Sequence, residues 1–137
     1  MGSTYHHLFY HYVWGTFKRL EMIDNEMEKD LRKIVNDKIV EKKSEMISFG
    51  CTSDHVHILV KQHPAVSVSE MIGEVKGYSS YVINKFKSPD FGFRWQRGFC
   101  AITISKKDLP WLKRYIKNQK DHHANIDLDP NLEIKQR

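Results

Sequence analysis

The chain has 137 residues, of which 40% are hydrophobic and 28% are charged, an ordinary composition for a globular protein. No apolar run reaches the roughly 20 residues that a membrane span needs, and the first residues lack the pattern of a secretion signal. We therefore expect a cytoplasmic protein without a membrane partner. The net charge of +5 makes nucleic acid a partner class to consider.

Hydrophobic periodicity predicts seven elements in a single domain over residues 1–137. Alternating or aromatic-rich stretches indicate strands, and apolar residues at every third or fourth position indicate helices. The expected elements are a strand over 7–16, a helix over 25–42, strands over 46–52 and 55–61, a helix over 67–86, a strand over 99–105 and a helix over 106–123. The domain core spans about residues 6–123, and 124–137 form a polar tail.

Local signals refine some of these boundaries. Ser67 and Glu70 match a capping box at the start of a helix, and Asn25 with Glu28 resembles one. A short turn signal links the second and third strands, so we expect them to form a hairpin. Alternation along the second strand places three apolar side chains on one face, namely Ile47, Phe49 and Cys51.

The first six elements follow the order strand, helix, strand, strand, helix, strand. This order predicts the ferredoxin-like α+β arrangement, an antiparallel sheet with helices on one face. The other face is open for a site, unless the last helix covers part of it.

Two histidines alternate with apolar residues along the third strand. Because successive side chains point to opposite faces, His55 and His57 share one face, and Val56, Ile58 and Val60 share the other. Two imidazoles placed in this way can share one divalent cation, and a hard ion then needs a third ligand that carries oxygen. The alternative is a pair of half-exposed histidines without a metal.

The last predicted helix adds a tyrosine and a glutamine. Tyr115 and Gln119 are four residues apart, so they lie on one helical face beside the apolar stripe. A tyrosine hydroxyl with a pKa near 10 is a poor nucleophile, but it becomes useful when a metal polarises a phosphodiester. The carbonyl oxygen of Gln119 can complete the metal shell. The alternative is an amphipathic tyrosine at a helix edge.

Cations and aromatic residues are mixed around the loop over 88–98. Single-stranded nucleic acid suits such a surface, because phosphates attract cations and bases stack on rings. The candidate DNA-binding residues are Lys85, Arg94, Trp95, Gln96 and Arg97. A solvated basic loop with buried aromatics is the alternative, and Trp95 in particular can belong to the core. On the first strand, His6, His7 and His11 are expected to be structural or to face DNA.

Three motifs, taken together, resemble the single-tyrosine HUH transposases of small insertion sequences, the IS200-like and REP-associated group. They are Asp54-His55-Val56-His57, Phe93-Arg94-Trp95-Gln96-Arg97-Gly98-Phe99 and Tyr115-Ile116-Lys117-Asn118-Gln119, followed by His122-His123. The resemblance covers about residues 6–123. Two departures are Cys100, where relatives often have glycine, and a basic run after the first strand that is reduced to Lys18 and Arg19.

The resemblance implies a metal-dependent nickase. It implies Tyr115 as the nucleophile, and His55, His57 and Gln119 as ligands of Mg²⁺ or Mn²⁺. Single-stranded DNA with hairpin ends would be cut near the hairpin, held as a 5′-phosphotyrosine and rejoined during transposition. Such enzymes are commonly homodimers joined at sheet edges, in which the tyrosine helix can serve the partner's metal site.

Three other functions stay open. A non-catalytic RNA or DNA binder of this fold would carry stacking aromatics on its central strands, where this chain has histidines. A domesticated hairpin-binding protein would keep the motifs without transposition. Other HUH nickases, such as replication initiators and relaxases, are generally larger.

Overall fold

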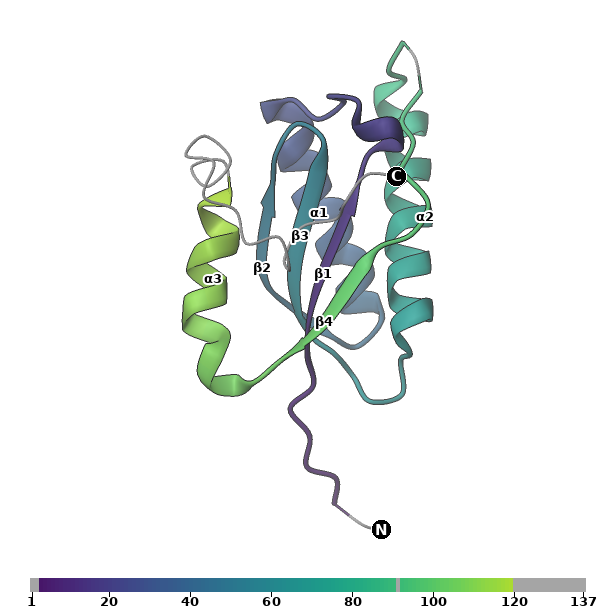
Figure 1. The fold of residues 1–137 in the computed structure, drawn as a ribbon. Coiled ribbons are helices and arrows are strands. Elements are labelled where there is room, and N and C mark those ends of the chain that lie inside the picture. The colour runs from purple at the N-terminus through teal and green to yellow at the C-terminus, as the bar shows by residue number, and fades with distance from the viewer. Residues whose placement is uncertain (1–2, 91, 120–137) are drawn as a thin grey trace.

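A computed structural model describes residues 3–90 and 92–119 of the chain (Figure 1). The strands are β1 (Phe9–Gly15), β2 (Glu45–Cys51), β3 (His55–Lys61) and β4 (Cys100–Ile104), and the helices are α1 (Asn25–Glu41), α2 (Val68–Lys87) and α3 (Leu109–Lys117). Two short 3-10 turns, η1 (Phe17–Arg19) and η2 (Lys106–Asp108), precede α1 and α3. All seven predicted strands and helices are therefore present, in the predicted order.

The four strands form one antiparallel sheet in the order β2-β3-β1-β4. The central strand β3 pairs with β1, where His55 lies opposite Gly15 and His57 opposite Val13. On its other side β3 pairs with β2, where His57 lies opposite Gly50. The predicted ferredoxin-like arrangement and the hairpin of β2 with β3 are both confirmed.

Helices α1 and α2 cover one face of the sheet, and the main hydrophobic core lies between them and the strands (Figure 1). Leu31 and Ile39 of α1 are fully buried there, on the apolar stripe of that helix. Val56, Ile58 and Val60 of β3 join the same core, as the alternation of the strand predicted. Burying one such side chain contributes about 1.5–3 kcal/mol.

Helix α3 packs on the opposite face of the sheet, against β2 and β3. Leu112 and Ile116 of α3 meet Leu59 of β3 in a smaller second cluster. A Cβ atom on Gly50 of β2 would lie only 1.9 Å from the backbone oxygen of Ile116. A glycine inside a strand is typical of a place where another backbone approaches closely, and here it allows α3 to lie directly on the sheet.

The predicted faces of the second strand were wrong at one position. The register of β2 against β3 shifts between Met46 and Ser48, which is a β-bulge with one extra residue. Ile47 consequently packs in the cluster beneath α3, while Phe49 and Cys51 belong to the main core. The three residues do not share one face.

The start of α1 also differs from the prediction. Asp24, and not Asn25, is the N-cap, and its carboxylate accepts a hydrogen bond of 2.8 Å from the N–H of Met27. At the start of α2 the predicted cap is confirmed, because the Ser67 hydroxyl accepts a hydrogen bond of 3.0 Å from the N–H of Glu70.

The last helix begins later than predicted. η2 occupies the first positions of the predicted range, and α3 starts at Leu109 with Pro110 in its first turn. Residues 120–123 of the predicted helix, His122 and His123 among them, lie outside the described residues, as does the predicted tail. No helix in the described ranges is both long and apolar enough to cross a membrane.

Candidate active site

His55 and His57 lie side by side on the sheet face that also carries α3. Their ring centroids are 5.2 Å apart, and the side chains are 1% and 0% exposed. Strand alternation explains the placement, because the neighbouring Val56 and Ile58 point into the main core on the other face. A buried imidazole needs polar partners, and each of the two histidines has a different set.

The Nδ1 atom of His55 lies within hydrogen-bond distance of three side chains. They are the Asp54 carboxylate at 2.7 Å, the Thr52 hydroxyl at 2.8 Å and the Arg19 guanidinium at 3.0 Å. Burial alone would raise the pKa of Asp54, but hydrogen bonds from His55 and Arg19 hold it well below its ordinary value. Asp54 is therefore ionised and accepts the Nδ1–H of His55, which fixes the direction of the ring.

The turn η1 brings Arg19 back over the end of β1. Lys18 and Arg19 both have a left-handed backbone, with φ of 53° and 55°, which costs about 1–2 kcal/mol for each residue with a side chain. Gly15 leaves the necessary space, because a Cβ atom there would lie 2.8 Å from the Arg19 side chain and 2.6 Å from the Gln96 side-chain oxygen. Arg19 and Gln96 thus both lie next to Gly15, the pairing partner of His55.

His57 is oriented from the neighbouring strand β1. The Nε2 atom of His11 lies 2.8 Å from the Nδ1 atom of His57, and the two rings stack with 5.0 Å between centroids. His11 is fully buried. The sequence predicted a structural or DNA-facing role for His11, and the structure shows a structural one, because His11 orients His57. The sequence did not predict this contact, which depends on the register of β1 against β3.

Tyr115 of α3 packs against His57. The centroids of the two rings are 6.1 Å apart, and the tyrosine side chain is 6% exposed. The close approach of α3 at Gly50 is what brings them together, because Gly50 is the strand partner of His57. One turn earlier, Trp111 stacks on Tyr115.

Gln119 lies two residues beyond the end of α3 and is 1% exposed. It lines a pocket together with Gly50 and Cys51, which are the strand partners of His57 and Val56. The same pocket is lined by Glu28 and Arg32 of α1, so Gln119 lies beside β2, and the contact with His57 is made by Tyr115. Within residues 3–90 and 92–119, no group of three His, Cys, Asp or Glu side chains is placed to hold a metal.

The loop that precedes β4 is tied to α2. The indole N–H of Trp95 donates to the Ser79 hydroxyl at 2.9 Å, and the Asn84 side chain binds both the N–H and the carbonyl of Phe93, at 2.6 and 2.9 Å. Trp95 packs against the main core. This packing favours the structural alternative for Trp95 over contact with DNA.

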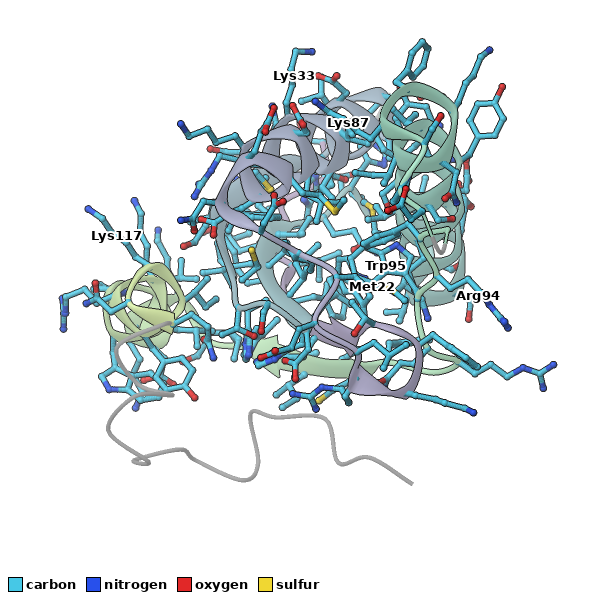
Figure 2. All side chains as sticks on the ribbon, turned by 90° about the horizontal axis from the view of Figure 1, so that it is seen from above. Met22, Lys33, Lys87, Arg94, Trp95 and Lys117 are labelled. Atoms are coloured by element: carbon cyan, nitrogen blue, oxygen red, sulfur yellow. The ribbon has the colours of Figure 1, made fainter. Side chains whose placement is uncertain are left out.

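The other candidate DNA-binding residues lie on α2 and in the loop that precedes β4. Lys85, Arg94 and Arg97 are exposed, and the Arg94 guanidinium lies 4.1 Å from the centroid of the Phe17 ring. Figure 2 shows Arg94 extending outward on the side away from α3, whose Lys117 extends in the opposite direction. Gln96 differs from these cations because its side chain reaches Gly15, beside His55.

Comparison with known proteins gives a consistent family signal. The family model described as "Transposase IS200 like" matches residues 4–119. The chain is 25% identical over 117 residues to the ISDra2 transposase TnpA of Deinococcus radiodurans, covering 82% of this chain and 84% of that protein. It is 29% identical over 115 residues to the transposase for insertion sequence element IS200 of Salmonella typhimurium, covering 80% and 75%.

Two solved structures share the fold. One is a crystal structure from Deinococcus radiodurans R1, described as a transposase, with a TM-score of 0.68 and 24% identity, covering 87% of this chain and 96% of that chain. The other is the REP-associated tyrosine transposase bound to a REP hairpin, with a TM-score of 0.67 and 15% identity, covering 90% and 75%.

Proposed function

Because the chain belongs to the IS200-like transposase family, we propose that it cuts and rejoins single-stranded DNA through a 5′-phosphotyrosine intermediate at Tyr115. The observation that carries this proposal is the contact of Tyr115 with His57, with ring centroids 6.1 Å apart, on the face that also presents His55. A phenol beside two oriented imidazoles combines a nucleophile with metal ligands.

The residues present fit a divalent cation. The Nδ1 atom of His55 faces Asp54, and the Nδ1 atom of His57 faces His11. The Nε2 atoms would therefore coordinate the cation. Metal-binding histidines usually have such a hydrogen-bond partner on the ring nitrogen that does not bind the metal. The Gln119 carbonyl oxygen would supply the third ligand, and a set of two imidazoles and one oxygen suits Mg²⁺ or Mn²⁺ weakly and reversibly. When bound, the cation polarises the scissile phosphodiester and stabilises the charge on the leaving 3′ oxygen.

The chemistry of Tyr115 is an exchange of phosphodiesters. Its hydroxyl loses a proton and attacks the phosphorus, the tyrosine O–P bond forms, and the P–O3′ bond breaks. The released 3′ oxygen takes up a proton and becomes a hydroxyl. Rejoining reverses these steps, with another 3′ hydroxyl as the attacking group, so the two reactions together need no external energy source.

We further propose that the DNA carries a hairpin. A structural neighbour of this chain is a REP-associated tyrosine transposase bound to a REP hairpin. Here the exposed Lys85, Arg94 and Arg97 would supply positive charge for phosphates, and the side chain of Gln96 reaches Gly15, the pairing partner of His55. A homodimer joined through sheet edges is a further expectation, since it would satisfy unpaired edge groups.

The test is a denaturing gel of the purified protein after incubation with Mg²⁺ or Mn²⁺ and hairpin oligonucleotides from its own genomic flanks. We expect a protein–DNA species that survives denaturation, disappears with a chelator and is absent from Tyr115→Phe, which still binds the DNA. His57→Ala should lose both cleavage and metal binding. Tyr78→Phe, on the opposite sheet face, serves as the matched tyrosine control and should form the species normally.

Tight hairpin binding without a covalent species, in every metal tried, would contradict the proposed nickase. The protein would then be a non-catalytic hairpin binder that has kept the fold of its family.

A further inference from the structure

Trp111 is a large aromatic side chain that stands half exposed beside Tyr115. Its exposed fraction is 52%, against 6% for Tyr115. The two rings stack with 5.7 Å between centroids and 22° between their planes. One side of the indole therefore lies against the phenol of Tyr115, and much of the remaining ring surface faces solvent.

Core packing does not account for this tryptophan. The buried residues beneath α3 are Leu59, Leu112, Tyr115 and Ile116, and Trp111 is not among them. Tryptophan has a large apolar surface, and leaving half of it in water forgoes a stabilising burial. The exposed part of the indole is available for contact with a ligand next to Tyr115.

The segment of the chain that contains Trp111 is rich in cationic residues. Between positions 106 and 117 the chain has five cationic residues and a single acidic one, Asp108. The cationic residues are Lys106, Lys107, Lys113, Arg114 and Lys117. Lys117 can be followed in Figure 2, where its side chain extends from α3 away from the sheet. Arg114 follows Trp111 by three residues, so these two side chains lie on the same side of α3. A cation beside an exposed ring matches the needs of single-stranded DNA, whose phosphates attract cations while its bases stack.

We propose that Trp111 is a stacking platform for one unpaired base next to the phosphate that Tyr115 attacks. This proposal rests on the proposed function and adds the residue that holds the strand at Tyr115. Tyr115 lies one helical turn from Trp111. A base stacked on the solvent side of the indole would therefore hold the DNA backbone close to the Tyr115 hydroxyl. A paired base in a hairpin stem has no open face to offer, so the platform selects the single-stranded flank of the hairpin.

The experiment measures DNA binding in the Tyr115→Phe background, where no covalent species forms. The probes are hairpin oligonucleotides from the genomic flanks, together with a series in which each unpaired base is replaced in turn by an abasic site. We expect Trp111→Ala to weaken binding about tenfold or more, the effect of losing one stacked base, and Trp111→Phe to keep most of the affinity. Tyr78→Ala, an exposed aromatic on the other sheet face, is the matched control and should bind normally.

The abasic series identifies the stacked base. One abasic position should weaken binding to the parent protein as strongly as Trp111→Ala does, and should have no further effect on Trp111→Ala. If every abasic position weakens both proteins equally, the platform is wrong. If Trp111→Ala binds normally and only slows covalent attachment, Trp111 merely supports Tyr115, which also overturns the proposal.

Two more readouts separate the remaining explanations. The first readout is the mass of Trp111→Ala in sedimentation. A changed mass together with an unchanged DNA affinity would mean that this face contacts a second copy of the chain, which would overturn the platform. Covalent attachment by the unmodified protein tests the proposed function separately. If Trp111→Ala matches the unmodified protein in both covalent attachment and DNA affinity, only the stacking platform is refuted. If the unmodified protein itself forms no covalent species, the proposed function is refuted.

Discussion

Two glycines shape the candidate site at the scale of single residues. Gly50 leaves room for the backbone of α3, and Gly15 leaves room for Arg19 and Gln96 beside His55. Both lie on strands, where glycine weakens packing and usually marks a close approach. The absence of a side chain at these positions is what allows residues from distant parts of the chain to meet at the two histidines.

Gly50→Ala should therefore separate Tyr115 from His57. The added Cβ atom would lie 1.9 Å from the Ile116 backbone oxygen, so α3 has to move, at a cost of about 1–3 kcal/mol of folding stability. We expect a protein with normal circular dichroism that forms little or no covalent species with DNA. The control is Gly73→Ala on α2, where a Cβ atom meets nothing within 4 Å. A Gly50→Ala protein with unchanged attachment would show that the contact of α3 with the sheet is unnecessary.

The sequence was most informative about residues close together along the chain. The shared face of His55 and His57 follows from strand alternation, and the neighbourhood of Tyr115 and Gln119 from their spacing. The contacts of His11 with His57 and of Arg19 with His55 join residues 46 and 36 positions apart. They depend on the register of β1 against β3 and on the left-handed turn at Arg19, and neither feature has a reliable signal in one sequence.

At the scale of elements, capping decides where α1 begins. The predicted cap, Asn25, is the first helical residue, and Asp24 accepts the hydrogen bond from Met27. The two residue types are nearly equal as caps, so composition alone did not distinguish them. The bulge in β2 was equally unpredictable from composition, because one extra residue turns Ile47 to the other face of the sheet and no sequence pattern marks it.

Asp24→Ala should destabilise the protein by about 1 kcal/mol, because one N–H at the start of α1 loses its partner. Asp24→Asn is the matched control, since asparagine caps almost as well. Urea unfolding followed by circular dichroism measures both. An equal loss in the two variants would mean that the charge of Asp24, and not the capping hydrogen bond, stabilises the helix.

At the scale of the whole molecule, the fold was the most predictable feature. Six elements in the ferredoxin-like order leave few topologies, and the observed order β2-β3-β1-β4 is the one expected. The position of α3 was less predictable, because the packing of a seventh element depends on which part of the open face has room for it. The homodimer stays a prediction.

One chain contains every residue of the proposed site. Tyr115 contacts the His57 of its own chain, whereas the resemblance implied that the tyrosine helix can serve a partner's metal site. We predict that an equimolar mixture of Tyr115→Phe and His57→Ala forms no covalent species with hairpin DNA. Attachment restored by mixing would mean that the tyrosine acts on the site of a second subunit, since each variant supplies what the other lacks.

The most direct test of Tyr115 as the nucleophile is to identify the residue that becomes attached to DNA. The covalent species formed with a hairpin oligonucleotide and Mn²⁺ would be digested with protease and nuclease and the peptides analysed by mass spectrometry. We expect a single modified peptide that contains Tyr115 and carries a 5′-linked nucleotide. A nucleotide on any other tyrosine, or on a residue of another type, would contradict the assignment of α3 as the catalytic helix.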